Sequence, residues 1–282
     1  MIRKGFTLIE LLVVIAIIAL LLSIVMPGLN MAKKKAASAA CLSNAKQMSL
    51  AWYMYQGESD GEIVAALMEN VGVNTECREG WIGQPHLATD ATSSSLSMTQ
   101  TSPVTDEDES RGAEKGKLYP YLENPDVFHC PADKLRKGPD GTRLYVSYAL
   151  PTCLNGASGD TQIKKYGDIT SPGTRFTFVE SGERERGNWI AQGHFIMATP
   201  EYGHGGYGLW SPLAISHGDS AVFGFADGHA EVHKWHDQQI FEHYMRTEGA
   251  GAGATYDTLM IAPGVSEDFD WLVKGWAYRY KR

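Results

Sequence analysis

The chain has 282 residues, a formal net charge of -8 and four cysteines. Its acidic balance argues against a nucleic-acid-binding protein, which would carry a basic patch. No two cysteines form a Cys-x-x-Cys pair, which argues against a zinc ribbon. About 225 residues follow the apolar amino-terminal part, enough for one globular core or two small ones.

The amino terminus combines a basic leader with a membrane-length apolar run. Arg3 and Lys4 lie in the leader, and the run from Phe6 to Met26 has 21 residues. A helix of about 20 apolar residues crosses a hydrocarbon core, and basic residues before it favour a cytoplasmic amino end. The sequence therefore predicts a single membrane span with an exported head.

Glu10 is the only charged residue in this run. A lone carboxylate among lipid tails is costly and needs a partner. A cut between Gly5 and Phe6 would expose an α-amino group able to serve as that partner. Two other interpretations, a secretory signal peptide and a plain single-pass anchor, leave Glu10 unexplained.

The string Gly-Phe-Thr-Leu-Ile-Glu, from Gly5 to Glu10, resembles the class III signal of type IV pilins and type II secretion pseudopilins. The resemblance implies that a prepilin peptidase cleaves after Gly5 and methylates the new amino terminus at Phe6. It implies that Glu10 neutralises that amine on a neighbouring subunit during assembly. Pro27 matches the family's helix-breaking proline, so we expect a kink or local melting there.

We expect three parts: a leader (1–5), a long helix (6–56) whose segment 6–26 is transmembrane or filament core, and a head (57–282). An apolar stripe on the second half of the helix should pack under the head. Its members recur at steps of four, three, four and three: Cys41, Ala45, Met48, Trp52 and Tyr55.

The cysteines leave the disulfide pairing open. Because Cys41 lies on the apolar stripe, we expect a small buried side chain there rather than a disulfide partner. An exported head permits disulfides, and Cys77, Cys130 and Cys153 could supply one bridge.

The head begins with a weakly patterned segment. Residues 81–83 suggest a short strand, and residues 89–111 are rich in Ser, Thr and acidic residues, which indicates an exposed loop. Calcium is an alternative for its acidic peak at 105–110, but the spacing fits no EF-hand. We therefore predict no cofactor.

Regular elements follow in the rest of the head. A short helical turn is expected over 117–122, and a helix over 238–245. Alternating β-branched and aromatic residues predict strands over 145–150 and 174–180.

The clearest local signal in the head is a hairpin within 217–235. Asp227-Gly228 lies between two alternating runs and favours a two-residue type I′ turn. That turn would pair Phe223 with Val232 and direct both toward the long helix.

The other face of this hairpin would carry His229, Glu231 and His233, with His217 near in sequence. These residue types can bind zinc. However, residues four apart on a strand are about 13 Å apart, too far to share one ion. We predict an exposed polar face and no metal site.

His217, nine residues and Asp227-Gly228 resemble the "H-X9-DG" motif of a group of prepilin-type proteins. The segments 41–47 and 128–133 match that group as well. The resemblance implies an α+β, pilin-like fold: a long amino-terminal helix packed on an antiparallel sheet with loop-rich insertions. It brings no catalytic residue with it.

We therefore predict a structural subunit of a type IV pilus-like filament or a type II secretion pseudopilus, not an enzyme. Its implied partners are copies of itself, the prepilin peptidase and an inner-membrane assembly platform. The head would be periplasmic before assembly into a pseudopilus or a cell-surface filament. The alternative is a membrane-tethered module that binds glycan or metal through aromatic loops such as 202–210.

Overall fold

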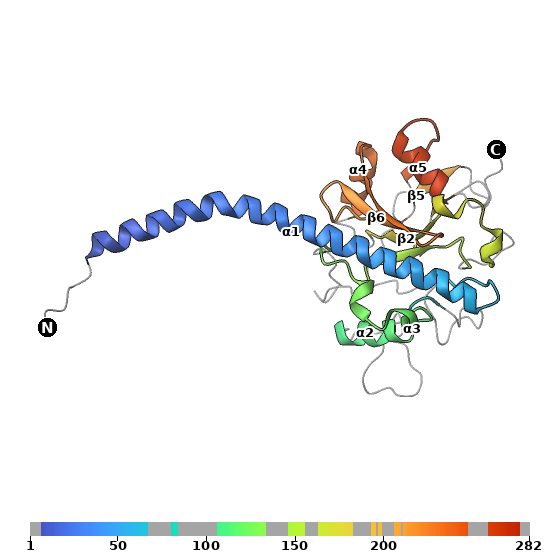
Figure 1. Ribbon diagram of the computed structural model, residues 1–282. Coiled ribbons are helices and arrows are strands. Elements are labelled where there is room, and N and C mark those ends of the chain that lie inside the picture. The colour runs from blue at the N-terminus through green and yellow to red at the C-terminus, as the bar shows by residue number, and fades with distance from the viewer. Residues whose placement is uncertain are drawn as a thin grey trace, which may run out of the picture.

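The computed structural model describes residues 7–66, 80–83, 106–133, 146–155, 163–182, 193–195, 197–198, 206–209, 211–247 and 259–276. A single long helix leads into an α+β head (Figure 1).

The long helix α1 spans Leu8–Glu58, or 51 residues. At 1.5 Å per residue it is about 75 Å long. Its first half projects away from the head, and its second half lies across it (Figure 1). The helix ends two residues beyond the predicted position, where Asp60 and Gly61 adopt positive φ angles of 51° and 78°.

The main sheet has five strands in the order β3-β1-β2-β6-β7. All pairs are antiparallel except β1 with β3, which is parallel. The strands are β1 Tyr148–Pro151, β2 Phe176–Glu180, β3 His194–Phe195, β6 Ser220–Phe225 and β7 Ala230–Lys234. The predicted antiparallel sheet is thus confirmed, and so are the strands expected near 145–150 and 174–180.

A second sheet and four shorter helices complete the described part of the head. The second sheet runs β4-β5-β8 and is antiparallel. Its strands are β4 Met197–Ala198, β5 Tyr207–Leu209 and β8 Leu259–Ile261; the helices are α2 Asp106–Glu114, α3 Tyr119–Leu122, α4 Gln238–Thr247 and α5 Glu267–Trp276; three 3-10 turns are η1 Pro125–Phe128, η2 Tyr166–Asp168 and η3 Pro172–Thr174. The helical segments expected at 117–122 and 238–245 are confirmed as α3 and α4.

Two local predictions are wrong. The acidic peak near 105–110 begins helix α2 instead of lying in a loop. Acidic side chains are favourable in the first turn of a helix because they face its positive end. Residues 81–83 form no strand: Gly80 bridges Ala65, and the Trp81 and Ile82 side chains are buried. The rest of the predicted loop, 89–105, lies outside the described residues.

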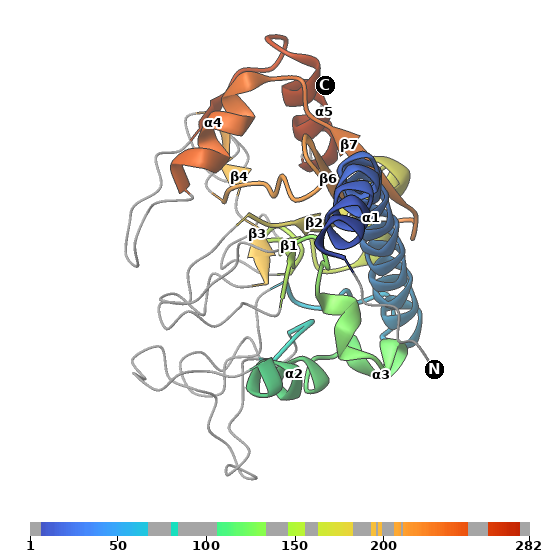
Figure 2. The same cartoon turned by 90° about the vertical axis from the view of Figure 1, so that its left-hand side faces the viewer.

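The main sheet is covered on both faces. On one face the stripe of Cys41, Ala45, Met48 and Trp52 packs against a core that includes Val222. On the other face, a second core joins Phe176 and Phe223 of the sheet to residues of α5. In Figure 2, which looks nearly along α1, the helix lies beside β6 and β2, with α4 and α5 above them.

The Asp-Gly hairpin forms, but its register differs by one residue from the prediction. Val222 pairs with Val232, and Phe223 pairs with Glu231. The N–H of Phe225 donates to the carbonyl of His229, which leaves a three-residue turn in which only Gly228 has a positive φ, 90°. A type I′ turn needs positive φ at both central residues, whereas this turn is of the kind that ends in a glycine bulge.

The register shift reverses the predicted orientation of β6 alone, because Val232 of β7 pairs with Val222 and stays on the helix side as predicted. Val222 and Gly224 face the helix, and Phe223 lies in the opposite core. A Cβ atom at Gly224 would collide with Ser49 Oγ of α1 and lie 3.3 Å from the Ala45 carbonyl oxygen. Glycine is therefore required where the helix crosses the strand.

Candidate functional site

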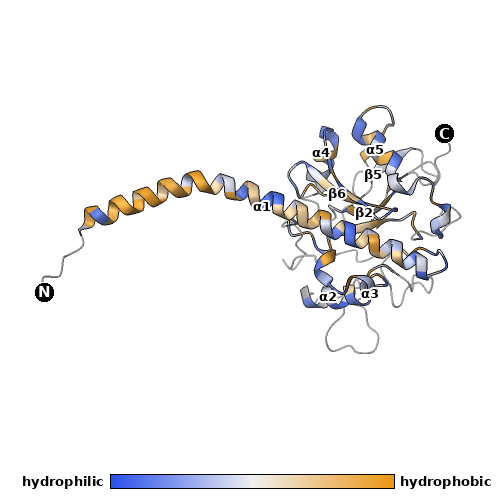
Figure 3. Cartoon of the chain, in the orientation of Figure 1, coloured by the Kyte–Doolittle hydropathy of each residue, from blue (hydrophilic) through white to orange (hydrophobic). Residues whose placement is uncertain are grey.

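The first half of α1 is an apolar surface that nothing in the described chain covers. Every large apolar side chain from Leu8 to Met31 is between 49% and 74% exposed. Figure 3 shows this surface as a nearly continuous hydrophobic segment ahead of the head. Soluble monomers rarely expose apolar patches of more than a few hundred Å². This half of α1 is long and apolar enough to cross a membrane.

Glu10 lies in the first turn of α1 and forms a capping box with Thr7, the residue before the helix. Its Oε2 accepts hydrogen bonds from the Thr7 N–H at 2.9 Å and the Thr7 hydroxyl at 2.7 Å. In return, the Glu10 N–H donates to Thr7 Oγ1 at 3.3 Å. The carboxylate therefore holds the first turn of the helix, a role that the sequence reasoning missed although Thr7 lies three residues before Glu10.

Pro27 lies inside α1, and the helix continues through it. The alternative of local melting is therefore wrong, because a single lost hydrogen bond does not unwind a helix with many turns on each side. The exposed half of α1 is curved in Figure 1. Gly5 and Phe6, the predicted processing residues, lie outside the described residues.

Comparison with known families gives a match at this end of the chain. Residues 1–26 match the prokaryotic N-terminal methylation motif. The match covers the first 26 of 282 residues and supports a type IV pilin-like precursor. No curated protein and no solved structure matches it.

The motif at residues 1–26 has general implications for processing and assembly. A prepilin-type motif implies processing by a prepilin peptidase and assembly into pilus-like polymers. The apolar first half of α1 fits a single-pass, membrane-anchored precursor. The match ends at residue 26, so the H-X9-DG resemblance of the head is not part of it.

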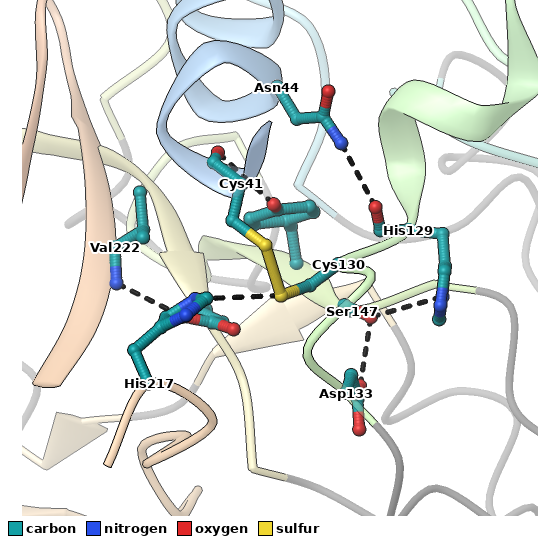
Figure 4. The surroundings of a disulfide bond; sticks show 10 residues. Cys41, Asn44, His129, Cys130, Asp133, Ser147, His217 and Val222 are labelled. Atoms are coloured by element: carbon teal, nitrogen blue, oxygen red, sulfur yellow. Dashed lines mark hydrogen bonds and ion pairs between the residues drawn. A yellow bond between two sulfur atoms is a disulfide. The ribbon is translucent and has the colours of Figure 1, made fainter. Parts of the chain in front are cut away.

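The head contains a buried disulfide that includes Cys41, so the expectation that Cys41 is not a disulfide partner is wrong. Cys41 of α1 bonds to Cys130, which follows η1, and their Cα atoms are 5.2 Å apart (Figure 4). That separation lies within the usual disulfide range. Cys153 is buried outside this bond, and Cys77 lies outside the described residues. A cysteine on an apolar helix stripe gave no sign of its partner 89 residues away.

His217 and Glu180 lie against this disulfide. His217 Nε2 is 3.5 Å from Cys130 Sγ and 3.3 Å from Glu180 Oε2. Both side chains are almost completely buried, with 2% and 1% of their surface exposed. Glu180 Oε2 also accepts the N–H of Val222 at 3.1 Å (Figure 4). Sequence reasoning noted His217 in a motif and beside the hairpin residues considered as zinc ligands, but it missed Glu180, which ends a strand and gave no signal.

The histidines of the β6–β7 hairpin have separate partners. His229 bonds to Asp227. His233 Nε2 donates to Asp268 Oδ1 of α5 at 2.8 Å, and its ring stacks on that of Trp271 with the ring centroids 3.8 Å apart. The predicted exposed polar face is therefore wrong at His233, because α5 covers it.

Asp268 anchors this contact between α5 and the sheet. Its pKa lies below the usual value: burial opposes ionisation, but the His236 N–H, the His233 side chain and the Asp237 N–H outweigh it. The two backbone bonds, to Asp268 Oδ2, are 2.6 and 2.7 Å long. Such hydrogen bonds to a carboxylate favour its charged form.

The aromatic loop proposed for ligand binding is only partly described. Within 202–210, Tyr207 and Leu209 are buried in strand β5. Residues 202–205 and 210 lie outside the described part of the chain.

Proposed function

We propose that the chain is a structural subunit of a type IV pilus-like filament or a type II secretion pseudopilus. A prepilin peptidase would cut between Gly5 and Phe6, and the subunit would assemble through α1. Before assembly it would lie in the inner membrane with a cytoplasmic amino terminus and a periplasmic head.

The exposed apolar half of α1 is the observation that carries this proposal. A single-pass anchor needs only about 20 apolar residues to satisfy lipid, and it gives no reason for a charged group near its start where a neutral acceptor could also cap the helix. In a filament, helices pack side by side, and Glu10 can meet the amine of a neighbour. Such a head-to-tail contact between identical subunits does not close, so it propagates into a fibre.

The capping box makes Glu10 a residue with two separable tasks. As a cap it needs only an acceptor oxygen, which a glutamine at the same position also offers. As a partner for a terminal ammonium group it needs its negative charge. Glu10→Gln therefore keeps the cap and removes the charge, while Thr7→Ala removes the hydroxyl half of the cap and keeps the charge.

The test compares incorporation of these variants into filaments sheared from cells, by immunoblot against equal amounts in the membrane. We expect Glu10→Gln and Glu10→Ala to lower incorporation by about tenfold or more, since an unpaired charge in a helix core costs about 3 kcal/mol. Thr7→Ala should keep most of the wild-type incorporation into filaments. Wild-type incorporation of Glu10→Gln would contradict the proposal.

A further inference from the structure

We propose that Cys41, Cys130, Glu180 and His217 form a zinc site when the two cysteines are thiols. The site is an alternative to the disulfide that the same sulfurs make. This inference concerns the head alone and does not rest on the filament function.

The four side chains converge from four separate segments. Cys41 comes from the middle of α1, Cys130 follows η1, Glu180 ends β2, and His217 precedes β6. One ligand atom from each lies within 4.8 Å of every other. Only the folded sheet and its packing on α1 bring them together, so the cluster belongs to the folded head and is not a local sequence motif.

The distances fit a tetrahedral ion. With Zn–S bonds of about 2.3 Å and Zn–N and Zn–O bonds of about 2.0–2.2 Å, neighbouring N and S atoms are about 3.5 Å apart and N and O atoms about 3.4 Å apart. The corresponding separations here are 3.5 Å from His217 to Cys130 and 3.3 Å from His217 to Glu180. The two sulfurs would have to separate to about 3.8 Å, and the other pairs of ligand atoms lie within 4.8 Å of each other.

The burial of Glu180 points to a missing cation. A buried carboxylate is costly unless hydrogen bonds and positive charge compensate it. Glu180 receives one backbone N–H through Oε2, while its Oε1 is buried and has no hydrogen-bond partner among the described residues. His217 Nδ1 is buried in the same way. A divalent ion bound by Nε2 and the carboxylate would supply the positive charge that the disulfide cannot.

The ligand set selects the metal. Two thiolates, an imidazole and a carboxylate suit zinc, whereas calcium and magnesium prefer oxygen ligands alone. Newly made chains carry both cysteines as thiols. Binding of Zn²⁺ to Cys41 and Cys130 then releases the two thiol protons and forms two Zn–S bonds, with no change of oxidation state. Oxidation to the disulfide removes both ligands and requires a thiol oxidant, such as a partner disulfide that accepts the two electrons.

The test uses the full-length chain in detergent with Cys77→Ser and Cys153→Ser, so that Cys41 and Cys130 are its only thiols. The chain is reduced with a water-soluble phosphine, and Co²⁺ is titrated anaerobically as a spectroscopic substitute for Zn²⁺. We expect sulfur-to-cobalt charge-transfer absorption, tetrahedral ligand-field bands, and displacement of cobalt by one Zn²⁺ per chain. The oxidised chain should show none of these.

Two variants distinguish a zinc site with four ligands from metal binding by the two cysteine thiolates alone. His217→Ala and Glu180→Gln should each weaken Zn²⁺ binding by about 10–100-fold or more, because even outer partners of a metal ligand contribute that much. His229→Ala, a histidine with its side chain 42% exposed, is the matched control and should leave binding unchanged. The idea is overturned if the reduced chain binds no cobalt, or if His217→Ala leaves the cobalt spectrum and the zinc affinity unchanged. The titration of the chain in which His217 and Glu180 are intact tests the proposed zinc site even where a variant of either residue fails to fold.

Discussion

The two halves of α1 belong to one continuous helix but meet different surroundings. From Leu8 to Met31 the large apolar side chains are exposed, whereas on the stripe from Cys41 to Trp52 they are buried against the sheet. The second half buries one stripe of apolar side chains, as a helix on a globular core should, and leaves others, such as Leu50 and Met54, exposed. The first half is apolar all round, which is typical of a helix surrounded by lipid or by other helices. One helix therefore meets two environments, and only the second is formed by the part of the chain that the structure describes.

The largest expected difference between the halves comes from truncating a side chain in each. Trp52 is completely buried, so Trp52→Ala should lower the free energy of unfolding of the head by about 3–5 kcal/mol. Ile17, in the exposed half, is 52% exposed, and Ile17→Ala should change it by no more than about 0.5 kcal/mol. Urea denaturation of the detergent-solubilised chain, followed by near-ultraviolet circular dichroism, measures both. Equal losses would mean that the first half also packs on the head.

A smaller effect is expected from a glycine in the contact between α1 and the sheet. Gly224→Ala would drive a methyl group into Ser49 Oγ and should cost about 1–3 kcal/mol of head stability. Removing the hydroxyl with Ser49→Ala should recover part of that loss, in a double-mutant cycle by the same denaturation assay.

Gly28 is the matched control for this change, because an added Cβ there meets nothing within 4 Å. Gly28→Ala should leave the head as stable as before. If Gly224→Ala also left the head as stable as before, α1 would not cross β6 as closely as described.

The smallest effect is expected on the face of the sheet away from α1, and it depends on pH. Because the pKa of Asp268 is lowered in the folded head, its carboxylate stabilises the fold above the usual unfolded pKa of about 3.9. That contribution is lost as the pH falls through the lower folded value.

Asp268→Asn should therefore lower the urea midpoint at pH 7 and flatten the fall in stability below about pH 4. Glu114→Gln, at an exposed glutamate, should change neither. If the stability of Asp268→Asn falls below pH 4 as steeply as that of the unmodified chain, other carboxylates cause the fall.

The sequence alone predicted what depends on local pattern. The leader, the helix, its buried stripe and the Asp-Gly hairpin each arise from neighbouring residues. The hairpin register could not be predicted, because a tertiary contact accompanies the turn: the N–H of Ala226 donates to the carbonyl of Arg175 at 2.9 Å. A one-residue change of register exchanges the two faces of a strand.

The buried cluster could not be predicted for a related reason. Cys41, Cys130, Glu180 and His217 are spread over 177 positions of the chain, and no spacing connects them. Cys41 fits an apolar stripe and Glu180 ends a strand, so each has an ordinary explanation by itself. Their meeting depends on the pairing of β2 with β6 and on the packing of α1 across both.

The position of the Cys41–Cys130 bond has a mechanical consequence. Cys41 is the first buried residue of α1 on the way into the head. In a filament of the proposed kind, a pull along the fibre would reach each head at this point. Without a covalent link, the side-chain contacts between α1 and the head could separate one after another. A disulfide at the first buried residue of α1 makes all these contacts share the tension. The sheet would then stay packed on α1 under tension for as long as the Cys41–Cys130 bond is intact.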